Sequence, residues 1–542
     1  MPKFPSKALT KIESKAATEF LTTCAKFKDF APKQLFKLNR QVAKQFRIPC
    51  LSQSSILRVY QALIQQGKMK AKPELLNALR KNKIRTLSGV APIAVLTKPA
   101  PCPGKCVYCP SESKVPKSYN SNEPAVMRAI RNKFDAYKQV TARIKALEAT
   151  GHDTSKCEII VMGGTFSSLP REYQTTFMKG VFRGLAGKVP GRVNHAALAT
   201  LQHSNESSPH RCVGLTLETR PDEIDLVEIK NMRRLGATRV EIGVQSVFDD
   251  VLKKVKRGHL SRETIQATYL LKEAGFKVCY HLMPNLPGSS LEKDLEMFQE
   301  LFGNPDFQPD QIKIYPCLVT KDAKLRKWYE QGKFKPYTDT ELVQLLAKIK
   351  QIIPPYVRII RLGRDIPVPN IIAGIKFSNL RQLAQAELKK QGKKCRCIRC
   401  REVRDQQVLG SKLKFVKQTY VASGGVEHFL SFEDPRTDQL YAHLRLRIPA
   451  SFLKGEKAIL PVLQDAAIIR ELHTYGEALP IAARKPDASQ HHGLGKKLMQ
   501  EAEKIVRQAG LKKIAVISGV GVRPYYRKLG YKLKEGYMLK KT

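Results

Sequence analysis

Short apolar runs alternate with longer amphipathic stretches through the middle of the chain. The runs cover residues 89–96, 158–162, 213–217, 239–244, 277–282 and 311–315. Each is followed by a stretch whose apolar residues have helical spacing. This alternation predicts βαβ units and a parallel sheet, open or barrel-like. In such folds the chemistry lies at the carboxyl ends of the strands.

The pattern changes at both ends of this region. Apolar residues three to four positions apart, such as Leu35 and Leu38, predict helices before it. Beyond it, Pro367 and Pro369 precede a basic run with eight Lys and Arg between 389 and 404, and a second α/β unit follows. We therefore expect four segments, at residues 1–85, 86–365, 366–420 and 421–542.

The charge of the chain is strongly positive. Its 542 residues include 95 Lys and Arg and 48 Asp and Glu, a net charge of +47. Residues 1–100 alone carry 20 basic and 4 acidic side chains. This balance favours a polyanionic partner such as nucleic acid, although a solvated cationic surface would have the same composition. The 42% hydrophobic content excludes wholesale disorder.

The sequence contains no run of about 18 apolar residues, the length that a membrane span requires, and residues 1–7 lack the apolar core of a signal peptide. We expect a cytoplasmic protein that does not use a membrane. In a reducing compartment, clustered cysteines indicate metal chemistry more than disulfides. Six of the twelve cysteines form two clusters, at 102–109 and 395–400.

The first cluster, Cys102, Cys106 and Cys109, has the spacing C-x3-C-x2-C directly after the run at 89–96. Three thiolates on one tight loop can bind three irons of a 4Fe-4S cluster and leave the fourth iron for a small molecule. A zinc knuckle is the alternative, but it needs a fourth ligand that is not nearby. The spacing is typical of radical S-adenosylmethionine (SAM) enzymes.

Polar and glycine residues follow the next predicted strands. Bare backbone at a strand end can approach the SAM amino group, and charged or amide groups can bind its carboxylate and ribose. The predicted SAM-binding residues are Gly163, Gly164, Glu218, Arg220 and Gln245.

The C-terminal unit carries a pattern for coenzyme A. Residues 490–496 read Gln-x-x-Gly-x-Gly-Lys at the start of a predicted helix, where free N–H groups and the helix dipole favour phosphate. This resembles the pyrophosphate loop of GNAT-type acetyltransferases. Tyr525 and Tyr526 lie in a Tyr-x-x-x-Gly-aromatic turn, where a phenol could protonate a leaving thiolate. Residues 470–476 predict the strand that would lie beside the pantetheine arm.

The order of these motifs resembles the catalytic subunit of Elongator, a radical SAM tRNA uridine carboxymethyltransferase, in its stand-alone microbial form. The resemblance covers about residues 75–542. It rests on segments including SYNSNEPAVMRAI (118–130), VMGGTFSSLP (161–170), GLTLETRP (214–221), EIGVQSV (241–247), HLMPNLPG (281–288), GGVEHFLSFEDP (424–435) and ISGVGVRPYYRKLGY (517–531).

The resemblance implies an α/β fold with a partial TIM-like radical SAM barrel, a C-terminal GNAT-type domain and a small basic helical N-terminal region. It implies that 5-carboxymethyluridine is made at the wobble position of the tRNA anticodon stem-loop from acetyl-CoA, SAM and water. A homodimer is possible. The N-terminal region would aid tRNA binding. Carried over, acetyl-CoA contacts fall on Lys156, Glu471, Leu472, His473, Thr474, Leu494, Gly495, Lys496 and Tyr526, with Lys156, Tyr525 and Tyr526 as catalytic candidates.

The second cysteine cluster comprises Cys395, Cys397 and Cys400 in the basic linker. Three sulfurs need a fourth ligand for tetrahedral zinc. Microbial members of the family have a zinc site here, so the resemblance implies Zn2+. The fourth ligand could be Cys317, a histidine or a water, and reduced thiols without metal remain the alternative.

Two other functions remain open at this stage. One is a protein lysine acetyltransferase with a structural radical SAM domain. The other is a tRNA-binding scaffold without turnover. The complete cysteine triad and the glycine-rich strand ends argue against a vestigial radical domain.

Overall fold

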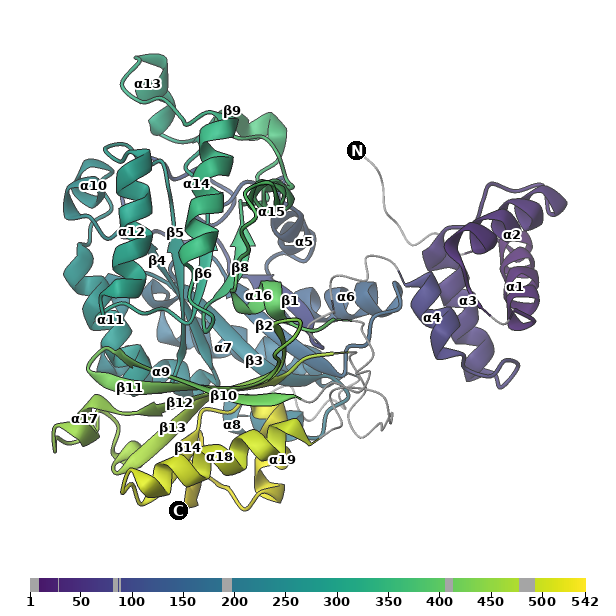
Figure 1. Cartoon of the computed structure of the whole chain (residues 1–542). Helices are drawn as coiled ribbons and strands as arrows, with labels where there is room; N and C mark the ends of the chain where they lie inside the picture. Colours follow the sequence, from purple (N-terminus) through teal and green to yellow (C-terminus); the bar gives the residue numbers. More distant parts are fainter. Residues whose placement is uncertain are drawn as a thin grey trace.

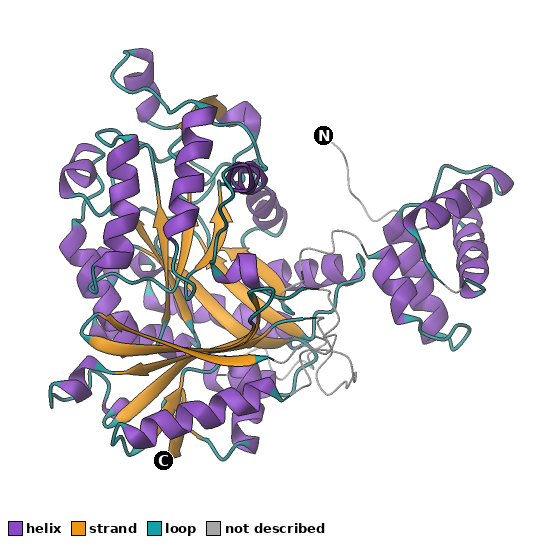
Figure 2. Ribbon diagram, viewed as in Figure 1, coloured by secondary structure: helices purple, strands orange, loops and turns teal. Residues whose placement is uncertain are grey.

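The computed structural model describes residues 9–27, 29–80, 86, 89–187, 197–404, 413–476 and 493–542. In this part of the chain, a helical bundle, a curled parallel sheet and a mainly antiparallel sheet follow one another (Figures 1 and 2). No helix there has both the length and the apolar character needed to cross a bilayer.

The first sheet is parallel throughout and forms an open half-barrel. Within the described residues its seven strands run in the order β1-β2-β3-β4-β5-β6-β8, so β1 and β8 are its edges. The strands are β1 (Ala91–Leu96), β2 (Lys156–Met162), β3 (Arg211–Thr219), β4 (Arg239–Gln245), β5 (Lys277–Leu282), β6 (Gln311–Ile314) and β8 (Arg358–Leu362).

The six predicted strands are therefore confirmed, with ends shifted by a few residues. Strand β8 was not predicted, because two of its five residues, Arg358 and Arg361, are charged. Both arginines line the interior cavity of the half-barrel. A strand with a charged face toward an internal cavity lacks the apolar run that marks buried parallel strands.

Helices cover the outer face of the half-barrel. Strand β5 illustrates why: Val278, Tyr280 and Leu282 are buried in the main core, whereas Lys277 and His281 line the cavity inside. The helices are α5 (Pro124–Arg131), α6 (Ala136–Glu148), α7 (Arg171–Leu185), α8 (Leu198–Asn205), α9 (Leu226–Leu235), α10 (Asp249–Lys254), α11 (Ser261–Glu273), α12 (Leu291–Gly303), α13 (Leu325–Glu330) and α14 (Asp339–Ile352).

The chain then passes through a linker of short elements. Strand β7 (Val319–Thr320) pairs with β9 (Ile371–Ala373), and helices α15 (Leu380–Lys390) and α16 (Ile398–Arg401) follow. The next sheet begins at Lys414, before position 421 at which the second unit was expected to start.

The C-terminal sheet has the order β10-β11-β12-β13-β14-β16-β15 in the described chain. Its neighbours are antiparallel except β13 and β14, which pair only from Ala466 to Ile469. Among the described residues, the rest of β13 pairs with β12 alone, so its other edge has no partner strand there. The elements are β10 (Lys414–Ala422), β11 (Gly425–Asp434), β12 (Gln439–Ile448), α17 (Ala450–Leu453), β13 (Ala466–Thr474), α18 (Leu494–Gln508), β14 (Lys513–Val516), α19 (Arg523–Lys528), β15 (Lys532–Lys534) and β16 (Tyr537–Lys541).

The two sheets meet through buried ion pairs at the amino ends of the barrel strands. Arg470 on β13 donates to Asp310, just before β6, at 2.8 Å. Arg447 on β12 donates to Glu273 at the end of α11 at 2.7 Å. Because such groups are costly to bury unpaired, their mutual contacts hold the two sheets in one relative position.

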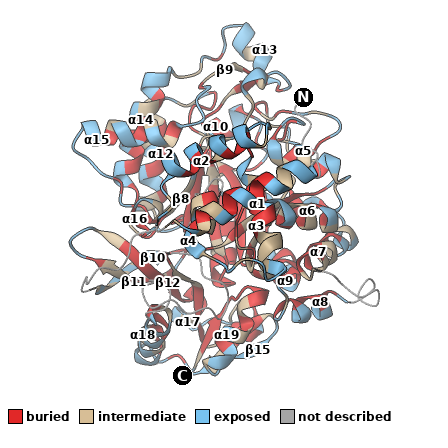
Figure 3. Cartoon of the chain, turned by 90° about the vertical axis from the view of Figure 1, so that its right-hand side faces the viewer, coloured by how far each residue is buried: buried red, intermediate tan, exposed pale blue. Residues whose placement is uncertain are grey.

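The N-terminal bundle has a core of its own and projects from the side of the half-barrel near α6 (Figures 1 and 3). Two contacts tie it to the region after α6: Gln61 Nε2 donates to the Glu148 carbonyl at 3.1 Å, and Arg80 Nε to the Gly151 carbonyl at 2.9 Å. Its helices are α1 (Lys11–Ala25), α2 (Pro32–Gln45), α3 (Gln53–Gln65) and α4 (Pro73–Leu79).

Candidate functional site

The first cysteine cluster lies on the loop that leaves the carboxyl end of β1. Cys102, Cys106 and Cys109 are half-buried and line the cavity of the half-barrel. Arg257 Nη1 donates to Cys106 Sγ at 3.4 Å. Burial alone would raise the pKa of Cys106, but Arg257 lowers it below its usual value. Burial raises the pKa of Cys109 to about 11.

Sulfur spacing distinguishes the two cysteine clusters. A zinc ion with Zn–S bonds of about 2.3 Å holds its sulfurs about 3.8 Å apart. The sulfurs of Cys395, Cys397 and Cys400 all lie within 4.8 Å of one another. In the described part of the chain, those of Cys102, Cys106 and Cys109 do not. Thiolates on three irons of a cubane stand farther apart than the ligands of one ion. The first cluster is therefore spaced too widely to bind one zinc ion and is compatible with an iron–sulfur group.

Of the predicted SAM-binding residues, Gly164, Glu218, Arg220 and Gln245 line the cavity at the carboxyl ends of their strands. Gly163 is adjacent to Gly164 in the chain, and packing explains why a glycine stands there: a Cβ at this position would lie 2.1 Å from Thr97 Oγ1 and would clash with it. Arg220 is buried beside the cysteine loop and makes a two-pronged contact with Asp222, with Nη2 2.7 Å from Oδ2.

One cavity of about 2570 Å³ connects this end of the half-barrel to the C-terminal sheet. Its lining includes the cysteine loop at one end and His473, Lys496 and Tyr526 at the other. Between them lie charged side chains that point inward from the strands. This connection places the two sets of predicted site residues on one internal surface.

The charged interior residues form a chain of contacts along the cavity. Lys313 on β6 contacts Glu241 on β4, which accepts from His281 Nε2 at 2.9 Å. Burial would raise the pKa of Glu241, but Lys313 and His281 hold it well below its usual range. Arg239 bridges Glu241 to Glu158. Glu241 and His281 lie in sequence segments that carry the resemblance. The other residues of this chain of contacts were not predicted, because single charges in short strands resemble exposed positions.

Helix α18 begins at the predicted phosphate loop, so the free N–H groups of its first turn lie at that loop. Gly493 has φ +69° at the N-cap of α18, and Gly495 and Lys496 in the first turn line the cavity. A Cβ on Gly495 would lie 3.4 Å from the Tyr525 hydroxyl. Leu494 is buried in the core. Residues 490–492 of the motif lie outside the described residues.

Residues 471–474 form the second half of β13, within the strand predicted over residues 470–476. Leu472, His473 and Thr474 line the cavity, and burial lowers the pKa of His473 to about 3. The side chain of Glu471, however, contacts Lys277, Arg445 and His443. Its carboxylate therefore joins the two sheets, and only its backbone remains for a ligand along the strand.

The catalytic candidates also line the cavity. Tyr525 and Tyr526 stack edge to face with ring centroids 5.2 Å apart, and burial raises the pKa of both phenols. Lys156 begins β2 at the end of the half-barrel that faces the C-terminal sheet. Burial lowers the pKa of its ammonium group.

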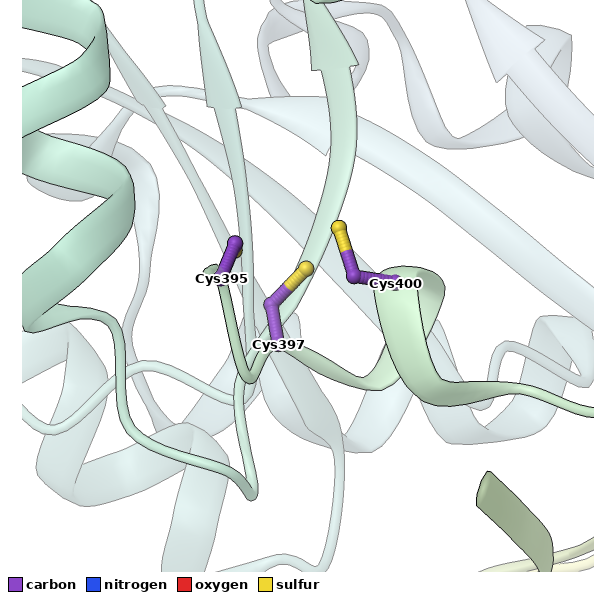
Figure 4. Close-up of side chains that lie close together, drawn as sticks. All are labelled: Cys395, Cys397 and Cys400. Atoms are coloured by element: carbon purple, nitrogen blue, oxygen red, sulfur yellow. The ribbon is translucent and has the colours of Figure 1, made fainter. Parts of the chain in front are cut away.

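The second cysteine cluster lies around α16 (Figure 4). Lys350 Nζ is 3.6 Å from Cys400 Sγ. Among the described residues, no fourth Cys, His, Asp or Glu joins the three sulfurs. Cys317 instead packs in a separate hydrophobic cluster with Val107 and Val319. The structure thus does not bring this candidate fourth ligand to the site.

A cationic rim surrounds the cavity on the side of β8 and the linker. It comprises Arg361, Arg381, Lys389, Lys393, Lys394, Arg399 and Arg404. Three of the eight basic linker residues, Lys390, Arg396 and Arg401, do not line the cavity. Arg396 and Arg401 pair with Asp438 at 2.9 and 3.1 Å.

Comparison with known proteins resolves the family. The Radical SAM superfamily profile matches residues 101–301, the Radical_SAM C-terminal domain 309–390, and the Acetyltransferase (GNAT) family 485–531. The tRNA uridine(34) acetyltransferase of Methanocaldococcus infernus is 46% identical over 478 residues, 86% of this chain and 88% of that protein. The chain belongs to the tRNA uridine(34) acetyltransferase family.

Other members of the tRNA uridine(34) acetyltransferase family show the same coverage. The Dehalococcoides mccartyi protein is 47% identical, over 84% of this chain and 98% of its own. Human Elongator complex protein 3 is 42% identical, over 86% of each. The solved structure of archaeal Methanocaldococcus infernus Elp3 with an N-terminal deletion has a TM-score of 0.73 and 42% identity, covering 84% of this chain and all of that one. The resemblance to the Elongator catalytic subunit and the predicted fold class are thereby confirmed.

Proposed function

We propose that this protein modifies tRNA, making 5-carboxymethyluridine at the wobble uridine from acetyl-CoA and SAM. The observation that carries this proposal is the single cavity that joins the cysteine loop to the open edge of β13. The radical SAM domain and the GNAT domain would then act on one substrate instead of on two separate ones. Relatives named tRNA uridine(34) acetyltransferase support the tRNA base as that substrate.

At the carboxyl ends of the barrel strands, Cys102, Cys106 and Cys109 would hold a 4Fe-4S cluster. When bound, that cluster supplies an electron for SAM cleavage, and the resulting radical chemistry activates the acetyl methyl group. Gly164, Glu218, Arg220 and Gln245 would bind SAM, since all of them line the cavity beside the loop.

At the other end, the open edge of β13 offers backbone groups to the pantetheine arm of acetyl-CoA. The free N–H groups of the first turn of α18, with Lys496, would hold the pyrophosphate. Tyr526 lines this end of the cavity, and its phenol would donate a proton to the leaving thiolate. Lys156 faces this region from β2 and would contact the acyl end.

The cationic rim and the basic N-terminal bundle would hold the phosphates of the anticodon stem-loop. Salt-dependent backbone contacts of this kind supply much of the affinity of nucleic-acid binding.

The linker cysteines would hold Zn2+, with the fourth position filled by a water or another small ligand. That site would have a structural role near the rim. A homodimer stays a prediction. A cytoplasmic location likewise stays a prediction.

The test is anaerobic reconstitution of the full chain with iron and sulfide, followed by incubation with SAM, acetyl-CoA carrying a labelled methyl group, and tRNA. We expect labelled 5-carboxymethyluridine at position 34 by mass spectrometry, together with 5′-deoxyadenosine. Label in protein lysine and none in tRNA would instead favour a lysine acetyltransferase. Binding of tRNA without deoxyadenosine or acetyl-CoA turnover would identify a scaffold.

A further inference from the structure

The half-barrel has an open seam between its edge strands, β1 and β8, and side chains bridge this seam at the cysteine-loop end. Arg364 follows β8, and its guanidinium donates to the Ser118 hydroxyl at 3.0 Å and to the Ser118 carbonyl. It also donates to Glu123 Oε1 at 3.1 Å. These acceptors lie on the loop before α5, more than 240 residues earlier in the chain, so one side chain connects both sides of the seam.

A second contact lies next to it. Asn122 and Asn370 exchange amide hydrogen bonds, with Asn122 Nδ2 donating at 3.1 Å and Asn370 Nδ2 at 2.8 Å. Asn370 immediately precedes β9, beyond Arg364 on the same side of the seam. The loop is thus held at two separate points, one of them charged.

Between those points the loop carries Tyr119, which faces the cavity. The Arg364 guanidinium lies 4.9 Å from the centroid of the Tyr119 ring, a distance at which a cation attracts the face of an aromatic ring. The Tyr119 hydroxyl donates to Glu218 Oε2 at 2.6 Å. Tyr119 and Glu218 are 7% and 6% exposed, so this hydrogen bond is shielded from bulk water.

Glu218 has a further neighbour across the cavity, Lys313 Nζ at 3.9 Å from Oε1. One of its oxygens therefore faces the interior charge network and the other accepts from Tyr119. A carboxylate held from two sides has few orientations left, and the cost of ordering it is met before a ligand arrives.

We propose that Arg364 is a positioning residue for SAM binding: it clasps the loop of Ser118–Glu123 across the seam and so holds Tyr119 against Glu218. This inference rests on the proposed function, because Glu218 is there a SAM-binding residue. Arg364 acts through Tyr119 and not on the ligand itself. The planar fork of arginine, which can serve several acceptors at once, suits this role better than lysine.

The experiment compares Arg364→Ala, Tyr119→Phe and the double variant in the reconstituted full chain, with Arg326→Ala as a control. Arg326 pairs with Glu330 on the exposed side of helix α13. We expect each single variant to weaken SAM binding about tenfold, the loss typical of one hydrogen bond to a charged group. The double variant should be no weaker than either single one, and acetyl-CoA affinity should be unchanged in all. Unchanged SAM affinity in Arg364→Ala, or losses that multiply in the double variant, would overturn the proposal.

Two further measurements keep the result interpretable. Arg364→Lys should bind SAM with intermediate affinity, and Tyr119→Phe removes only a hydroxyl, so these two carry the test if Arg364→Ala does not fold. Hydrogen exchange of residues 116–123 without SAM should rise in the Arg364 variants and stay at the wild-type level in Arg326→Ala. If the wild-type protein binds no SAM, the proposed function fails. If hydrogen exchange of residues 116–123 is the same in the Arg364 variants as in wild type, Arg364 does not hold this loop, whether or not SAM binds.

Discussion

Glu471 on β13 accepts a hydrogen bond from Lys277 Nζ on β5 at 3.0 Å. The same carboxylate accepts from Arg445 Nε at 2.9 Å. The strand proposed to bind acetyl-CoA is thus attached to the half-barrel by a buried charge. Together with the pairs Arg470–Asp310 and Arg447–Glu273, these contacts hold the two sites in one relative position.

Replacement of Glu471 by glutamine should destabilise the whole protein. The change leaves Lys277 without its anionic partner and removes one of the two carboxylates that contact Arg445, the other being Asp310. Breaking a buried pair costs about 3–5 kcal/mol. Urea unfolding followed by circular dichroism measures the loss. Glu330→Gln, which breaks an exposed pair in α13, should cost under about 1 kcal/mol. Equal stability of the two variants would contradict the interface role.

The same carboxylate predicts a dependence of stability on pH. Burial would raise the pKa of Glu471, but Lys277, His443 and Arg445 hold it well below its usual value. A depressed folded-state pKa contributes stability above the unfolded pKa of about 4.3 and loses it as the pH falls further. The free energy of unfolding should therefore fall below about pH 4 more steeply in wild type than in Glu471→Gln. Parallel curves from pH 6 to 3 would refute this.

Removal of one cluster ligand should separate chemistry from binding. In Cys106→Ala we expect no 5′-deoxyadenosine and no modified uridine, because one of the three thiolates of the cluster site is lost. Affinity for tRNA should remain near that of wild type. Cys50→Ala removes an exposed thiol outside the site and should retain full activity. Carboxymethylation by the Cys106 variant would show that the cluster is assigned to the wrong cysteines.

The cationic rim should contribute to the salt dependence of tRNA binding. Lys393→Ala with Lys394→Ala removes two charges that line the cavity. The slope of log affinity against log salt concentration should become shallower by about 1.4–1.8, the value for two phosphate contacts. Lys454→Ala with Lys457→Ala removes two exposed charges near α17 and should leave the slope unchanged. A slope that changes in the Lys454 and Lys457 variant and not in the Lys393 and Lys394 variant would place the tRNA path near α17 instead of at the cationic rim.

Zinc should be lost with the linker cysteines while iron remains. We expect about one zinc per chain in wild type by elemental analysis, and nearly none in Cys397→Ala, because each sulfur supplies one of few ligands. The iron content of the reconstituted protein should be the same in both. Zinc retained in Cys397→Ala would mean that the thiols are not its ligands.

Features that lie within a short stretch of sequence could be predicted. The loop from Cys102 to Cys109 brings its thiols together by spacing alone, and the apolar runs define six of the barrel strands. The glycine turn before α18 and the tyrosine turn of α19 are also local. Their geometry depends on backbone conformation over a few residues, which the sequence specifies directly.

Tertiary structure alone decided which distant side chains meet. Arg364 and Ser118 are 246 positions apart, and neither differs in sequence from an exposed polar residue. Glu471 was predicted at the acetyl-CoA strand, yet its carboxylate joins the sheets, and Cys317 is buried away from the linker cysteines. The charge of +47 and the cysteine motifs thus indicated the partner and the chemistry. The shared cavity and its buried ion pairs depend on how two sheets pack, because burial and pairing of charges are set by neighbours from other elements.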